Sequence, residues 1–165
     1  MKPSAIVYTS NTGHTERYAS LLSECLSLPF FDVKEAKKKL KKKDNVIYLG
    51  WLCAGDVKGY KKYARRYSVC AVVGVGLCDT GTMIDEVRSN ARIPLSIPVF
   101  TVQGGMDREK LKGINKFMIN TITKLVGAAS NKSESDERML YLLKNGGDFV
   151  CKENLSAVLA HFEIN

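Results

Sequence analysis

Short apolar runs alternate with polar, helix-like segments along most of this 165-residue chain, and this alternation constrains its fold more than any other feature. The apolar runs are residues 5–8, 30–33, 45–50, 69–75 and 97–102. The helix-like segments between them are residues 14–27, 34–43, 59–67 and 82–91. Strands that are buried on both faces read as continuous apolar runs, and parallel neighbours need a helical crossover. The pattern therefore predicts an α/β fold, a three-layer sandwich in which helices cover both faces of a five-stranded parallel sheet.

An additional segment follows the fifth predicted strand. We expect a helix over residues 107–126 with Gly127 as its stop, a short helix at 139–143, and a closing amphipathic helix at 153–163. The first of these helices has apolar residues at helical spacing, namely Leu111, Ile114, Met118, Ile122 and Leu125. Such a stripe most often packs into a core. With Lys110, Lys112, Lys116 and Lys124 beside it, the stripe also suits a membrane surface or an apolar acceptor.

Length and composition predict one domain over residues 1–165. Hydrophobic residues make up 45% of the chain, which is enough for a sizeable core. No apolar run approaches the roughly 20 residues of a transmembrane helix, and the first ten residues lack the apolar region of a signal peptide. We therefore expect a cytoplasmic protein. The five cysteines form no CxxC pair, so neither a disulfide framework nor a metal site is predicted.

The loop after the first predicted strand (the first loop, residues 9–15) combines one glycine with hydroxyl and amide side chains. A helix begins there, and helix N-termini carry free N–H groups and a partial positive charge. Such an end stabilises an anion, and hydroxyl groups add hydrogen-bond donors. The candidate phosphate-binding residues are Ser10, Asn11, Thr12, Gly13, His14 and Thr15. An ordinary capped strand-to-helix turn is the alternative.

Two further loops leave the sheet at the same edge, where open α/β sheets bind their ligands. The second loop (residues 50–56) contains the single tryptophan of the chain, and the third loop (residues 74–81) has three glycines in eight residues. The candidate residues of the second loop are Trp51, Leu52, Cys53, Ala54 and Gly55. Those of the third are Gly74, Val75, Gly76, Leu77 and Cys78. Each loop alone is equally compatible with a tight turn, with Trp51 packed into the core.

Taken together, the three loops resemble those of the flavodoxin family. The stretch SNTGHT (residues 10–15) resembles the family's phosphate loop, YLGWLCAGD (48–56) its second loop, and VVGVGLCD (72–79) occupies the place of the third. The resemblance implies a parallel sheet of order 2-1-3-4-5 that binds FMN and serves electron transfer. It also implies that Gly55 lets its peptide turn, which offers the preceding carbonyl to the reduced flavin. The third loop departs from the family because it lacks an aromatic side chain to stack on the ring.

A looser similarity connects residues 104–127 and 145–155 with flavodoxin-like menaquinone-dependent protoporphyrinogen oxidases. This similarity implies an FMN-dependent oxidase of a small anionic substrate, with a quinone as the acceptor. No catalytic residue is carried over, and it remains open whether the chain is an electron carrier or an enzyme. A flavin-free basic module that binds nucleic acid or protein is the competing class. Nucleic acid is not expected as a partner, because no RNA-recognition or OB-fold pattern is present.

The formal net charge of +8 comes largely from two clusters. Residues 33–43 contain seven lysines and one glutamate, and residues 58–67 contain five basic residues interleaved with Tyr60, Tyr63 and Tyr67. Helical spacing predicts that the tyrosines pack inward while the basic side chains face water. Solvated faces are the ordinary reading of such clusters. Because the second cluster follows the second loop directly, we also expect an acidic redox partner protein or an anionic substrate.

Overall fold

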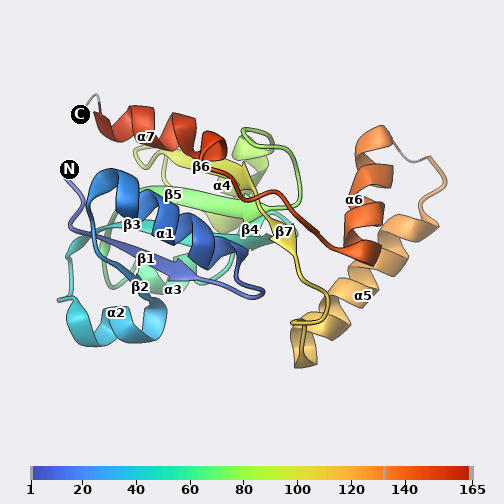
Figure 1. Ribbon diagram of the computed structural model, residues 1–165, viewed down its shortest axis with the longest axis horizontal. Coiled ribbons are helices and arrows are strands. Elements are labelled where there is room, and N and C mark those ends of the chain that lie inside the picture. The colour runs from blue at the N-terminus through green and yellow to red at the C-terminus, as the bar shows by residue number, and fades with distance from the viewer. Residues whose placement is uncertain (1, 132, 164–165) are drawn as a thin grey trace.

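The computed structural model describes residues 2–131 and 133–163, and its centre is a parallel sheet between two layers of helices (Figure 1). The strands are β1 (Ala5–Thr9), β2 (Phe30–Asp32), β3 (Asn45–Cys53), β4 (Asp56–Val57), β5 (Ser68–Gly76) and β6 (Val99–Gln103). Five of them lie side by side in the order β2-β1-β3-β5-β6, and short β4 pairs antiparallel with β3. Counted without β4, this is the order 2-1-3-4-5, so the predicted fold class is confirmed.

The helices divide between the two faces of the sheet. They are α1 (His14–Leu26), α2 (Val33–Lys39), α3 (Tyr60–Tyr63), α4 (Ile84–Ala91) and α7 (Ser156–Glu163), the last preceded by the 3-10 turn η1 (Glu153–Leu155). One apolar cluster joins α1, η1 and α7 to one face, and another joins α2, α3 and α4 to the other. Side chains of β1 alternate between the clusters, since Ile6 belongs to the first and Val7 to the second. This alternation follows from the two-residue period of a strand.

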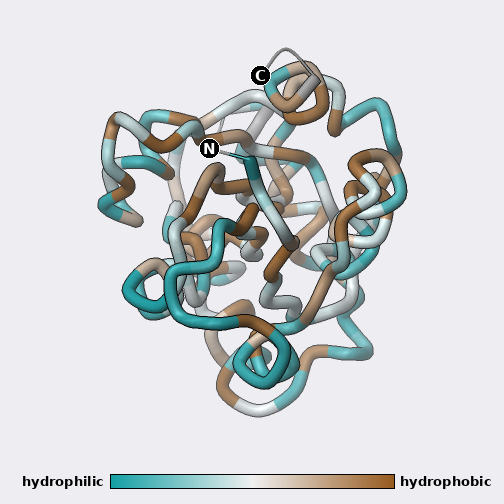
Figure 2. Tube along the Cα trace, turned by 90° about the vertical axis from the view of Figure 1, so that its left-hand side faces the viewer, coloured by the Kyte–Doolittle hydropathy of each residue, from teal (hydrophilic) through white to brown (hydrophobic). Residues whose placement is uncertain are grey.

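The sheet interior is formed by the apolar runs of the sequence. Residues 69–75 of β5 are all buried, as expected for a central strand that is covered on both sides. In Figure 2 the hydrophobic strands lie inside, and most of the hydrophilic segments lie around them. The inward packing predicted for Tyr60, Tyr63 and Tyr67 is confirmed, because all three are buried against the second face.

The insertion forms a two-helix arm. A short antiparallel pair, β7 (Gly105–Met106) with β8 (Gly147–Asp148), is its base, and the arm itself consists of α5 (Gly113–Ala128) and α6 (Glu134–Asn145). We call residues 113–145 the α5–α6 arm. It extends from the end of the sheet at which β1, β3 and β5 terminate (Figure 1). Among the described residues, no helix is both long enough and apolar enough to cross a membrane.

Three details of the insertion differ from the prediction. Helix α5 begins at Gly113 instead of residue 107, because the Asp107 carboxylate accepts hydrogen bonds from the backbone N–H groups of Glu109 and Lys110 and holds a turn there. Gly127 is not the stop, since α5 continues to Ala128. Helix α6 is longer than residues 139–143, because a capping box of Ser133 and Asp136 starts it earlier.

The predicted apolar stripe packs inward only in part. No residue of α5 is buried, and Ile122 lies against a small cluster around Met106 and Leu143. Ile114 and Leu125, by contrast, are largely exposed. The reason is the two-helix construction of the arm, which gives α5 neighbours on one side only.

Candidate functional site

The first loop presents an open helix N-terminus at the edge of the sheet. Gly13 is the N-cap of α1 with φ of +99°, and no side chain caps the helix. The Ser10 hydroxyl accepts a hydrogen bond of 3.1 Å from the Gly13 N–H, which folds the loop back on itself. Thr15 is buried as a residue, and its hydroxyl group forms no hydrogen bond with the described residues. The loop therefore offers backbone and hydroxyl donors that no carboxylate of the chain occupies.

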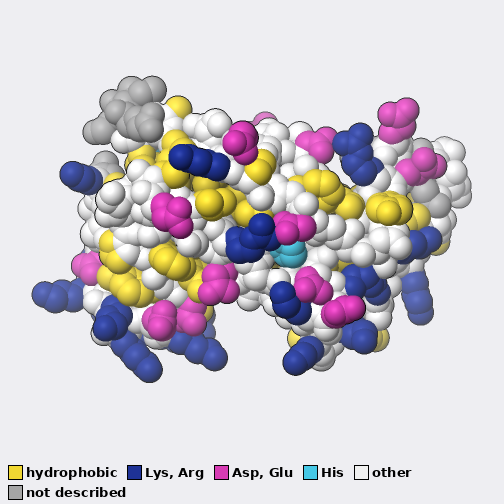
Figure 3. All heavy atoms as spheres, in the orientation of Figure 1, with side chains coloured by type: hydrophobic (Ala, Val, Ile, Leu, Met, Phe, Trp, Pro, Cys, Tyr) yellow, Lys and Arg dark blue, Asp and Glu magenta, His cyan; other side chains and the backbone are white. Residues whose placement is uncertain are grey.

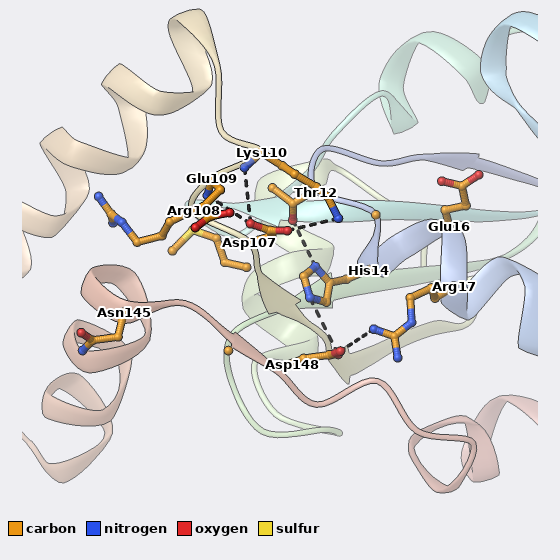
Figure 4. A pocket seen from close by; sticks show the side chains of 13 residues that line it. Thr12, His14, Glu16, Arg17, Asp107, Arg108, Glu109, Lys110, Asn145 and Asp148 are labelled. Atoms are coloured by element: carbon orange, nitrogen blue, oxygen red, sulfur yellow. Dashed lines mark hydrogen bonds and ion pairs between the residues drawn. The ribbon is translucent and has the colours of Figure 1, made fainter.

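His14, one of the candidate phosphate-binding residues, lies inside the site. It is buried, with Nδ1 at 3.1 Å from the Thr12 hydroxyl and Nε2 at 3.8 Å from the Asp148 carboxylate (Figure 4). Burial lowers the pKa of the imidazole, although Asp148 opposes this effect. The Asp148 carboxylate also accepts a 2.5 Å hydrogen bond from Arg17, so β8 is attached to the start of α1. The uncharged imidazole of His14 thus joins the first loop to the base of the insertion.

A broad cleft of about 690 Å³, which we call the outer cleft, lies between the first loop and the base of the arm (Figure 4). Arg17, Arg108 and Lys110 contribute positive charge to its walls, and Asp107 and Asp148 contribute negative charge. Two of these cations are paired, since Lys110 lies 3.1 Å from Asp107 and Arg17 contacts Asp148. The outer cleft is therefore wide and polar, and much of its charge is internally compensated.

Two smaller cavities lie where the three loops meet. The inner cavity, of about 60 Å³, is bordered by Ser10, Asn11, Thr12, His14, Thr15, Trp51, Leu52, Val75, Gly76 and Leu77 together with Gly105, Met106 and Ile119. The apolar cavity, of about 220 Å³, is bordered by Leu52, Cys53, Ala54, Gly55, Gly76, Leu77, Cys78, Met83 and Glu86 and by the arm residues Ile119, Ile122, Met139 and Leu143. Both share Leu52, Gly76, Leu77 and Ile119. The cavity at the helix N-terminus therefore adjoins an apolar space.

Nearly all the candidate residues of the three loops line these spaces. Gly13 lines the outer cleft instead of the two cavities. Gly74 lines none of them, because it lies within β5, where an added Cβ would come within 2.8 Å of the Leu52 side chain. Gly74 thus provides room for Leu52, which is a packing role.

The second loop is bent at the residues that the resemblance singled out. Ala54 and Gly55 both have positive φ, at +49° and +72°. The Ala54 carbonyl accepts a 3.4 Å hydrogen bond from the Asn90 side chain of α4, and a Cβ on Gly55 would come within 2.3 Å of the Asn90 amide nitrogen. A side chain at position 55 would therefore be strained in its backbone and would also collide with α4.

Trp51 is half-buried at the end of β3, so it is not packed into the core as a turn residue would be. Its ring borders the inner cavity and lies 5.8 Å from the Lys58 ammonium group. Burial raises the pKa values of the Cys53 and Cys78 thiols, which keeps both protonated at neutral pH. Neither thiol is activated as a nucleophile.

The arm supplies site residues that sequence reasoning did not identify. Ile119, Ile122, Met139 and Leu143 form the outer wall of the apolar cavity. The Asn115 side-chain amide of α5 donates a 2.8 Å hydrogen bond to the Asn11 side chain, which joins the arm to the first loop. The helical apolar spacing of residues 111–125 was a signal for a packed face, but it did not say against which surface α5 would pack.

Comparison with known protein families gives one match: residues 5–133 match the flavodoxin domain. No curated protein matches the chain, and neither does any solved structure. The matched segment contains all three loops and α5, and the base strand β8 follows it.

Proposed function

Since the chain belongs to the flavodoxin family, we propose that it binds FMN in the two cavities and carries electrons between redox partners. The observation that supports this proposal most strongly is the continuity of the site. The helix N-terminus and the Thr15 hydroxyl border the inner cavity, and this cavity adjoins the apolar cavity between the second loop, the third loop and the arm. FMN has the matching sequence of parts, with a phosphate at one end and a flat aromatic ring system at the other.

The phosphate would be held by the first loop. The hydroxyl groups of Ser10, Thr12 and Thr15 and the free N–H groups at the start of α1 all border the inner cavity or the loop beside it. No lysine or arginine belongs to the loop itself. Charge stabilisation would therefore come from hydrogen bonds and from the helix dipole.

The ring would occupy the apolar cavity. Aliphatic and thioether side chains, including Leu52, Leu77, Ile119 and Met139, take the place of the stacked aromatic ring that the third loop lacks. Their dispersion contacts exclude water from a flat ligand, but they provide no π-stacking. We therefore expect side chains of the arm to cover the flavin ring in place of the aromatic residues that cover it in flavodoxins.

When bound, the isoalloxazine would supply the electron-accepting chemistry, and the protein would adjust its potential. The adjusting group would be the Ala54 carbonyl, because Gly55 has the conformational freedom that reorientation of this peptide requires. The carbonyl's present hydrogen bond from Asn90 would favour the orientation seen in the structure. The protonated thiols of Cys53 and Cys78 and the neutral imidazole of His14 supply no group that must gain or lose a proton during electron transfer.

The proposed partner is an acidic redox protein. Exposed Lys62 and Arg65 follow the second loop closely, and Lys61 forms a 3.2 Å ion pair with Asp56 of that loop. Attraction between these cations and an acidic surface would accelerate association at low salt. The rate of electron transfer to such a partner should fall as ionic strength rises.

A second candidate function is an FMN-dependent oxidase of a small anionic substrate. The outer cleft favours it, because a cleft of about 690 Å³ with Arg17, Arg108 and Lys110 in its walls adjoins the first loop and could admit a carboxylate-bearing molecule. The arm covers the apolar cavity, and this also favours a small substrate over a protein as the electron donor. Flavin reduction that requires such a substrate, with a quinone or dioxygen as acceptor, would support the oxidase over the carrier.

The test of FMN binding is reconstitution. The purified protein is stripped of small molecules, titrated with FMN and followed by quenching of flavin fluorescence, with the absorbance spectrum recorded after gel filtration. We expect one FMN per chain to elute with the protein. A protein that remains colourless and leaves FMN fluorescence unchanged would contradict the proposal and support a flavin-free basic module.

A further inference from the structure

One side of α5 carries a row of large apolar side chains that the rest of the described chain leaves uncovered. Ile114, Phe117 and Leu125 have relative exposures of 81%, 73% and 68%. Their spacing of three and eight residues places them on one side of the helix, with Thr121 between them. Ile119 and Ile122 lie outside this row and border the apolar cavity. Helix α5 is thus apolar both toward the site and toward solvent.

Positive charge accompanies this exposed row. Helix α5 contains Lys116 and Lys124 and has no aspartate or glutamate, and exposed Lys112 is its N-cap residue. Lys and Arg side chains project around the end of the molecule that holds the arm (Figure 3). The acidic side chains of the arm are in the first turn of α6, where negative charge stabilises the helix N-terminus. The charged groups that α5 presents to solvent are therefore all cations.

We propose that α5 binds an anionic lipid surface and lies in the interface with Ile114, Phe117 and Leu125 among the acyl chains. A helix of 16 residues is about 24 Å long, so this row can lie flat on a bilayer. Interfacial helices characteristically combine an aromatic and aliphatic side with lysines, whose long stems let the ammonium groups reach the headgroups. The charge balance selects anionic lipid, since a neutral bilayer would leave the lysines without counterions.

A different basic surface provides the internal comparison. Helix α2 and its following turn carry lysines at positions 34, 37, 38, 39, 41, 42 and 43, but no strongly exposed large apolar side chain is described there. This surface can attract anionic lipid through charge alone. Helix α5 differs because it can also bury apolar area, and this part of the binding should persist at salt concentrations that screen charge.

The inference concerns a surface outside the flavin cavities and does not depend on the proposed cofactor. The full-length protein, with and without FMN, is mixed with vesicles of phosphatidylcholine or of phosphatidylcholine containing phosphatidylglycerol, and the bound fraction is measured by sedimentation. We expect binding to the anionic vesicles that is reduced but not abolished by high salt. Failure to bind FMN would leave this result unchanged, so the two proposals fail separately.

Matched variants assign the binding to α5. Phe117→Ser should lower the partition coefficient roughly tenfold, because a large apolar side chain no longer enters the lipid. Leu95→Ser is the control, since Leu95 has 89% exposure but lies before β6, outside the arm. Lys116→Glu combined with Lys124→Glu should weaken binding to anionic vesicles by more than an order of magnitude. Lys38→Glu combined with Lys39→Glu is the charge-matched control on α2.

Three outcomes would overturn the proposal. The first is no binding to anionic vesicles. The second is binding that Phe117→Ser leaves intact while the α2 variant removes it, which would mean attraction by charge alone. The third is a concentration-dependent dimer that Phe117→Ser dissociates, in the absence of vesicle binding, which would mean that a second copy covers the row. Because Phe117 is exposed, its replacement should leave the protein folded, so a loss of vesicle binding can be assigned to the lost side chain. Circular dichroism of each variant checks that it is folded.

Discussion

Replacement of Thr15 by valine is the perturbation whose consequences the structure defines most sharply. Thr15 is buried at the start of α1 and borders the inner cavity, and its hydroxyl group forms no hydrogen bond with the described residues. Valine has nearly the same volume and shape. Thr15→Val therefore removes a donor from the site without removing a hydrogen bond from the protein.

The two expected magnitudes follow from this difference. Stability should change by less than about 0.5 kcal/mol, because no native hydrogen bond is lost and no space is left empty. A hydrogen bond to a charged phosphate contributes about 1.5 to 3 kcal/mol. The dissociation constant for FMN should therefore rise roughly 10- to 150-fold, since about 1.4 kcal/mol corresponds to a factor of ten.

The assay compares FMN with riboflavin, which has the same ring but no phosphate. Fluorescence titrations of wild type and Thr15→Val are run with both ligands, and urea unfolding measures stability. Thr123→Val is the control, since it removes a hydroxyl that hydrogen-bonds the Ile119 carbonyl on α5 and should leave FMN affinity unchanged. We expect Thr15→Val to weaken FMN and spare riboflavin. Equal weakening of both ligands, or of neither, would refute the assignment of the phosphate to the first loop.

Three further predictions concern groups around the site. Asn90→Ala should raise the first reduction potential of bound FMN by about 20 to 60 mV, because the Ala54 carbonyl loses the hydrogen bond that favours its present orientation. Anaerobic redox titration measures this potential, and an unchanged value would exclude a role of Asn90 in orienting the Ala54 carbonyl. Burial lowers the pKa of His14, so the unfolded chain takes up this proton more readily than the folded protein. The contribution of His14 to stability should be complete above about pH 6.5 and decline as the pH falls below that value. His14→Gln should flatten this slope in urea unfolding, and an identical slope would contradict the prediction. Tyr18→Phe should lower the free energy of unfolding by about 1 to 3 kcal/mol, because the buried hydroxyl donates a hydrogen bond to the Gln103 carbonyl. An unchanged free energy in urea unfolding would show that water takes the place of the hydroxyl.

The sheet and the first loop were predictable because their signals are local. Apolar runs such as residues 69–75 can be buried only as strands or helices, and their short length and β-branched residues favour strands. The predicted start of α5 at residue 107 was wrong, because the Asp107 carboxylate holds the residues before Gly113 in a turn. Glycine content alone likewise could not distinguish Gly74, which makes room for Leu52, from Gly55, which bends the second loop.

The remaining parts of the site depend on contacts between distant segments. The pairing of Asn115 with Asn11, and the position of His14 between Thr12 and Asp148, have no signature in the sequence. The same holds for the arm, whose periodicity indicated an apolar helix but not its two apolar sides. Only its placement over the strand ends shows that one side borders a cavity while the other meets solvent.

The central claim is that one continuous site takes a phosphate at the start of α1 and a flat ring beneath the arm. A crystal structure of the FMN-loaded protein tests it most directly. We predict phosphate oxygens within hydrogen-bond distance of the Thr15 hydroxyl and the first N–H groups of α1, with the ring between Leu52 and Ile119. A structure in which FMN lies elsewhere, or in which Trp51 fills the space between the loops, would contradict the account.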